Sequence, residues 1–116
     1  MVHRKLEKIS PVPPDQWPRI IYHFNKINRG RRISIEGYGG TKPHEHPQYT
    51  LPLLSVTYNP PEEGDLLTIA VGQERVEHEY RVEAPRELWM ETPDEEKGQA
   101  MEIVDKDKRH TVISLE

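Results

Sequence analysis

The chain contains no cysteine among its 116 residues. This absence excludes a disulfide framework, a thiolate nucleophile and a zinc site of the cysteine type, and it fits a reducing compartment. Long apolar runs are also missing, since no stretch approaches the roughly 20 apolar residues that span a bilayer. The first ten residues lack the apolar centre of a signal peptide. We therefore expect a cytoplasmic protein with no membrane partner.

Neither sign of charge dominates the sequence. It has 16 Lys and Arg against 20 Asp and Glu, which gives a formal net charge of −4. A mixed and mildly acidic surface favours solubility and gives little electrostatic reason to gather nucleic acid. Hydrophobic residues make up only 34% of the chain, a content that strands with one solvated face can tolerate. The composition favours an antiparallel β-sheet protein that does not primarily bind nucleic acid.

The N-terminal part divides into a lead-in and a helix. Residues 1–14 are polar and rich in proline, so we expect an extended lead-in before a single domain over residues 15–116. Apolar residues then recur at three- and four-residue spacing, which predicts an amphipathic helix from Asp15 to Asn28. The predicted buried stripe comprises Trp17, Ile20, Ile21, Phe24 and Ile27.

Period-2 alternation predicts strands in most of the remaining chain. The clearest case is Leu51 to Val71, where two alternating runs flank the turn-rich segment from Asn59 to Gly64 and indicate a β-hairpin. The apolar face predicted for this hairpin comprises Leu54, Val56, Tyr58, Leu67, Ile69 and Val71. A further strand is predicted from Arg31 to Tyr38, and more alternating segments follow between Glu79 and Leu115.

The width of such a sheet constrains the architecture. Six strands at about 4.8 Å spacing are nearly 30 Å wide, whereas one helix is only about 10–12 Å across. The sheet must therefore curl, fold over on itself, or share its apolar face with a second chain. We predict an α+β fold in which the N-terminal helix packs on a strongly curled antiparallel sheet of five to six strands, similar to a small Sm-like or SH3-like barrel.

Several segments resemble a known family. They are Trp17, the run Leu51-Pro52-Leu53-Leu54-Ser55-Val56-Thr57-Tyr58-Asn59-Pro60, Asp65-Leu66-Leu67, Ala84-Pro85-Arg86-Glu87-Leu88 and Met101-Glu102-Ile103-Val104-Asp105. Together they resemble a family of small, uncharacterised bacterial domains of unknown function that carry a Trp-Leu-Pro-Leu-Leu-Gly-Ile-Thr-Tyr-Asp run at the hairpin. This chain departs from that run at Thr50, Ser55 and Asn59. The resemblance implies a bacterial, soluble, single-domain protein and supplies no catalytic residue.

Two clusters carry binding chemistry. His44 and His46 flank Glu45 between two prolines, but zinc usually needs three or four protein ligands, and a solvated loop is the simpler interpretation. The basic cluster comprises Lys26, Arg29, Arg31 and Arg32, with Tyr22 and Tyr38 nearby in sequence. It could form a nucleic-acid patch of an Sm-like module, but charges at a helix end and a strand edge are the simpler explanation because the whole chain is acidic.

Trp89 alternates out of phase with Leu88 and Met90, which places it on the polar face of its strand. An exposed tryptophan indicates a binding surface or a dimer contact unless the Pro-rich lead-in or a curled sheet covers it. Trp89 and Val112 are therefore the predicted contact residues for a protein partner or a second copy of this chain.

No catalytic residue is predicted, because carboxylate pairs lie in turns and no serine has the surroundings of a nucleophile. We expect a non-enzymatic interaction module without a cofactor. The alternatives are an Sm-like nucleic-acid-binding module and, third, a metal-dependent enzyme that uses His44 and His46.

Overall fold

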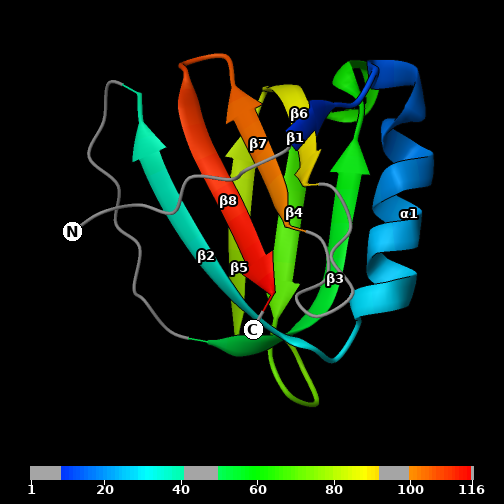
Figure 1. Ribbon diagram of the computed structural model, residues 1–116, viewed down its shortest axis with the longest axis vertical. Helices are drawn as coiled ribbons and strands as arrows, with labels where there is room; N and C mark the ends of the chain where they lie inside the picture. The colour runs from blue at the N-terminus through cyan, green and yellow to red at the C-terminus, as the bar shows by residue number, and fades with distance from the viewer. Residues whose placement is uncertain (1–8, 41–49, 92–99, 116) are drawn as a thin grey trace.

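The computed structural model describes residues 9–40, 50–91 and 100–115 (Figure 1). These ranges contain one α-helix, α1 (Trp17–Asn28), and two short 3-10 turns, η1 (Pro14–Gln16) and η2 (Pro61–Glu63). The strands are β1 (Ile9–Pro11), β2 (Arg32–Gly39), β3 (Leu51–Asn59), β4 (Leu66–Val71), β5 (His78–Glu83), β6 (Pro85–Glu91), β7 (Met101–Asp105) and β8 (Arg109–Leu115). Neither α1 nor a 3-10 turn in these ranges is long and apolar enough to cross a membrane.

The strands form one antiparallel sheet in the order β1-β6-β7-β8-β2-β3-β4-β5. The predicted α+β class, with one helix and an antiparallel sheet, is confirmed. The predicted count of five to six strands is wrong, because the sheet has eight. One additional strand comes from the lead-in, where Ile9–Pro11 pairs with Trp89–Glu91 of β6.

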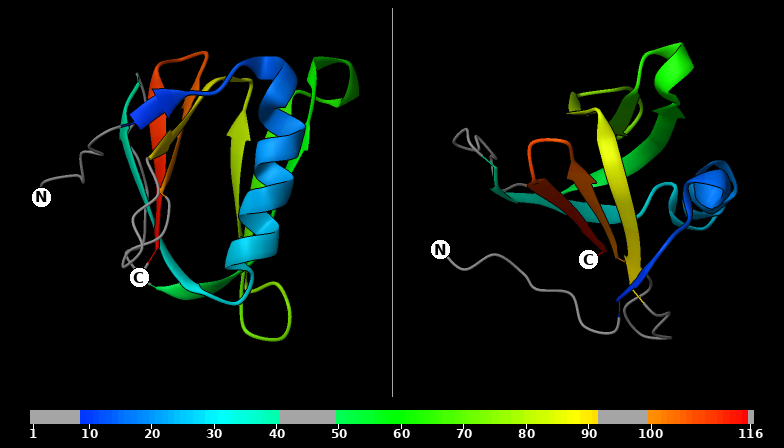
Figure 2. Two further views of the ribbon diagram at one scale, coloured as in Figure 1. Left: turned by 45° about the vertical axis from the view of Figure 1, so that its right-hand side comes forward. Right: turned by 90° about the horizontal axis from the view of Figure 1, so that it is seen from above.

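The predicted strong curl is also wrong, because the sheet neither curls strongly nor closes into a barrel. The order ends at β1 and at β5, and these two edges are not paired with each other. The sheet instead turns at one place, where β2 and β3 pair only through Arg32 with Pro52 and Ile33 with Leu51. This short pairing divides the sheet into two parts, β1-β6-β7-β8-β2 and β3-β4-β5. The two parts lie on different sides of the molecule (Figure 2).

One hydrophobic core fills the space between the two parts of the sheet and α1. Its buried residues come from all three: Trp17, Ile21, Phe24, Ile33, Ile35, Leu53, Val56, Leu67, Ile69, Val71, Val82, Leu88, Met101, Ile103 and Ile113. The sheet therefore folds over on itself, so each part covers the apolar face of the other. A single helix is sufficient because it only has to cover the side next to β3 (Figure 2).

The helix begins at Trp17 rather than Asp15, since Pro14–Gln16 form the 3-10 turn η1. Trp17 is buried, and its Nε1–H donates a hydrogen bond to the Val12 carbonyl at 2.8 Å. The prediction that Ile27 is buried is wrong, because 65% of its surface is exposed and Asn28 is buried in the last turn instead.

The predicted hairpin is confirmed as β3 and β4, with one change of register. The pairing shifts between Leu53 and Ser55, so a bulge falls at Leu54. Leu53 is consequently buried completely, whereas Leu54, which the alternation places on the core face, is only partly buried. A bulge adds one residue to a strand and reverses the faces on either side of it.

Candidate functional site

The outward face of α1 carries an exposed tyrosine followed by two cations. Tyr22 is 63% exposed, and Lys26 and Arg29 follow it at four and seven residues, so all three share one stripe of the helix surface. Together with Asn25 they line a surface hollow of about 350 Å³. We call this stripe of Tyr22, Asn25, Lys26 and Arg29 the helix surface.

The helix surface is basic although the whole chain is acidic. The sequence of α1 contains no Asp or Glu, while Arg19, Lys26 and the following Arg29 each add a positive charge. The entire chain has a formal net charge of −4, so its acidic residues lie elsewhere. This separation of charge gives the helix surface a local positive potential.

Asn25 fixes the helix surface to the sheet. Its Nδ2–H donates to the Val56 carbonyl at 2.7 Å, and its Oδ1 accepts the Val56 N–H at 2.6 Å. Val56 lies beyond the short pairing of β3 with β2, so β2 does not pair with it. The Asn25 amide forms hydrogen bonds with the backbone of β3 at this position instead. The base of the hollow is therefore held rigidly in place.

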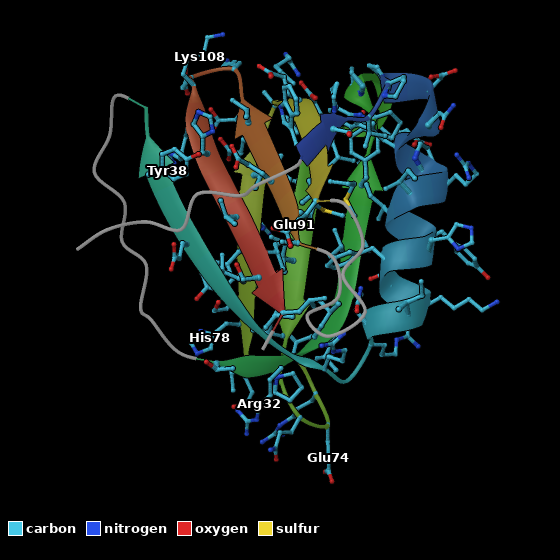
Figure 3. The ribbon with its side chains drawn as sticks, viewed as in Figure 1. Arg32, Tyr38, Glu74, His78, Glu91 and Lys108 are labelled. Carbon is cyan, nitrogen blue, oxygen red and sulfur yellow. The ribbon has the colours of Figure 1, made fainter. Side chains whose placement is uncertain are left out.

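The predicted basic cluster is divided in the structure. Lys26 and Arg29 line the hollow, whereas the guanidinium of Arg32 donates to the Thr50 carbonyl at 2.8 Å at the start of β2. Arg31 is partly buried, and its carbonyl accepts the N–H of Leu53. Figure 3 shows Arg32 directed away from α1. The hydrogen bonds of Arg31 and Arg32 thus stabilise the connection between α1 and the sheet, and neither residue belongs to the helix surface.

The two residues predicted as partner contacts lie on the other part of the sheet. Val112 is completely buried against Ala100 and the partly buried Tyr38. Trp89 is partly buried, its Nε1–H donates to Glu87 at 3.1 Å, and Pro11 of the lead-in lies opposite it on β1. Val112 therefore offers no surface to a partner in this structure.

His44 and His46 lie outside the described residues. Within residues 9–40, 50–91 and 100–115, no group of three His, Asp or Glu side chains is arranged to hold a metal ion.

A polar cluster that the sequence analysis missed joins β2, β7 and β8. The buried carboxylate of Glu102 accepts the Tyr38 hydroxyl at 3.0 Å, and its Oε2 lies 2.7 Å from His110 Nδ1. The rings of Tyr38 and His110 are stacked with centroids 4.5 Å apart, and Tyr38 projects from β2 beside β8 (Figure 3). Burial, followed by the hydrogen bond to Glu102 and its negative charge, raises the pKa of Tyr38 to about 12.

The cluster places the Tyr38 phenol, which stays protonated at neutral pH, and the His110 imidazole on the one buried side chain of Glu102. The only sequence signal was Glu102 within the apolar run from Met101 to Val104. Tyr38 and Glu102 are 64 residues apart, and the pairing of β2, β8 and β7 brings them together. Side-chain hydrogen bonds and ring stacking in this cluster therefore connect the three strands β2, β7 and β8.

No family model, curated protein or solved structure matches this chain. The resemblance to the bacterial domains of unknown function therefore stays a prediction.

Proposed function

We propose that this protein is a non-enzymatic interaction module whose helix surface binds an acidic segment of a partner protein. The observation that carries the proposal is the exposure of Tyr22 on the same stripe as Lys26 and Arg29, on a helix without acidic residues. Tyrosine and arginine are the residue types that most often dominate binding energy at protein interfaces.

Three features support a protein partner. Tyr22 and Ile27 are two of the few large apolar side chains that remain exposed, and both belong to α1. The hollow gives a side chain of the partner a place to enter. Asn25 holds the helix on β3, so little ordering of the helix is needed before a partner docks.

A nucleic-acid partner is the second candidate, because an aromatic ring between cations can also stack a base. The distribution of charge disfavours it. Only Lys26 and Arg29 of the four predicted cations line the hollow, and Arg32 is engaged with Thr50. Binding of single strands needs a continuous basic track along the backbone.

Fluorescence polarisation tests the proposal with a labelled peptide that combines Glu with Leu and Phe. We expect Tyr22→Ala to weaken binding at least tenfold, and Lys26→Glu with Arg29→Glu to abolish it. Matched controls outside the helix surface are Val76→Ala, which trims an exposed apolar residue, and Lys108→Glu, which reverses a charge at the far end of the β7–β8 turn. These controls should bind like the wild type.

Two outcomes would overturn the proposal. One is equal weakening by the helix and control variants, which would indicate non-specific charge attraction. The other is displacement of the peptide by single-stranded RNA that itself binds more tightly at moderate salt, which would assign the helix surface to nucleic acid. Light scattering on the same samples reports whether the protein instead fills this surface with a second copy of itself.

A further inference from the structure

A second hollow, of about 330 Å³, lies beside the β7–β8 turn, at the opposite end of the molecule from the β4–β5 turn (Figure 3). Its lining comes from the end of β5, the following Ala84, and the β7–β8 turn with its flanking strands: Arg81, Val82, Glu83, Ala84, Asp105, Lys106, Asp107, Arg109 and Thr111. We call it the end hollow.

Charged residues enter the end hollow from the inner face of the sheet. Side chains alternate along a strand, so Arg109 and Thr111 share the face of Ile113, which is a core residue. By the same rule Asp105 shares the face of Ile103 on β7. Thr111 and Asp105 are 6% and 7% exposed, which places polar groups where the apolar core ends.

Among the described residues, the cations of the end hollow have no carboxylate partner. Arg81, Lys106 and Arg109 form no ion pair with the part of the chain that the structure describes. The Nε of Arg109 is buried and has no hydrogen-bond acceptor among those residues. Buried polar groups are nearly always hydrogen-bonded, so this guanidinium nitrogen calls for an acceptor that residues 9–40, 50–91 and 100–115 do not supply.

The buried carboxylate of Asp105, which lines the end hollow, already accepts hydrogen bonds from the backbone. Asp105 Oδ1 accepts the backbone N–H groups of Asp107 at 2.8 Å and of Arg109 at 3.0 Å, which fixes the β7–β8 turn. The Lys106 N–H donates to the Ala84 carbonyl at 3.0 Å and ties this turn to the β5–β6 junction. Glu83 and Asp107 also line the hollow, so it holds negative as well as positive side chains.

We propose that the end hollow binds a small oxyanion, a carboxylate or phosphate group, through the guanidinium of Arg109. Arginine presents its N–H donors as a planar fork that fits both groups bidentately. The volume of the hollow lies within the size range of small-molecule sites. This site is separate from the helix surface, so the two proposals stand or fall independently.

An NMR titration of the ¹⁵N-labelled protein tests the site with inorganic phosphate, citrate and, at matched ionic strength, sodium chloride. We expect saturable shifts of the Asp107, Arg109 and Thr111 amides with phosphate or citrate, and none with chloride. Shifts with phosphate alone or citrate alone identify which oxyanion the site prefers. Arg109→Met should weaken the binding at least tenfold, and Arg81→Gln, on the exposed side of the hollow, should weaken it several-fold. Arg75→Gln, on the distant β4–β5 turn, should leave it unchanged.

The proposal is overturned if chloride produces the same shifts, or if no saturation occurs by roughly 10 mM anion, tenfold above a weak millimolar affinity. Unchanged binding in Arg109→Met, with the fold verified by its amide spectrum, also overturns it. If Arg109→Met does not fold, Arg81→Gln decides: binding equal to that of Arg75→Gln counts against the site.

Discussion

The side-chain amide of Asn25 binds both backbone polar groups of Val56, as a neighbouring strand would. The two hydrogen bonds, of 2.7 and 2.6 Å, join residues 31 positions apart. They occur where β3 has passed the end of its pairing with β2, so α1 completes the edge of the sheet with one side chain. This contact both anchors the helix surface and satisfies backbone groups beside the core.

We expect Asn25→Leu to destabilise the protein by about 2–4 kcal/mol, because it leaves two partly buried backbone groups without partners at about 1–3 kcal/mol each. Asn25→Asp should be intermediate, since it keeps the acceptor for the Val56 N–H and loses the donor. Urea unfolding measures both free energies. A loss below about 0.5 kcal/mol in Asn25→Leu, within the range of ordinary surface substitutions, would show that water replaces the amide.

The Tyr38–Glu102 contact predicts a dependence of stability on alkaline pH. The pKa of Tyr38 rises from 10.0 to about 12 on folding, so the folded state favours the protonated phenol. Its contribution is complete below pH 10 and is lost as the pH rises from 10 to about 12. Partial solvent exposure limits that contribution to about 1–2 kcal/mol.

Denaturant unfolding between these pH values, in the wild type and in Tyr38→Phe, measures the effect. The wild type should lose more stability than the variant as the pH rises. The pKa of Tyr58 is also raised, by burial and then by Asp65 and Glu62, and both proteins share that background. Parallel curves for the two proteins would rule out Tyr38 as the titrating group.

Position 72 requires glycine for two reasons: its backbone φ is positive, and a side chain there would have no room. Its φ is +155°, and a Cβ added there would lie 2.0 Å from the Arg75 carbonyl oxygen within the β4–β5 turn. We expect Gly72→Ala to cost about 3 kcal/mol or more, because the turn must be rebuilt in addition to the backbone strain. Gly64→Ala is the matched control, since Gly64 also has a positive φ, +123°, but its nearest neighbour lies at 4.0 Å.

Thermal unfolding of the two glycine variants separates the two causes. Gly64→Ala should cost only the strain of the left-handed backbone, about 1–2 kcal/mol. Equal losses in both variants would mean that the close approach to Arg75 contributes nothing.

The candidate sites were predictable only in part. The sequence grouped Lys26 and Arg29 with Arg31 and Arg32, but the chain turns after α1 and directs Arg32 to Thr50. Trp89 was expected at a surface, and the structure places β1 opposite it while burying Val112 completely. Strand alternation specifies two faces without stating which of them is covered.

Local sequence patterns are sufficient to predict α1 and the β3–β4 hairpin, because helix and strand periodicities depend on residues close together in the chain. How the sheet folds over and which charged side chains meet depend instead on tertiary packing. The contacts of Asn25 with Val56 and of Tyr38 with Glu102 depend on strand order and register, and so does the position of the Arg109 Nε, which has no acceptor among the described residues. Those features arise from packing between distant segments, which no local pattern of side chains encodes.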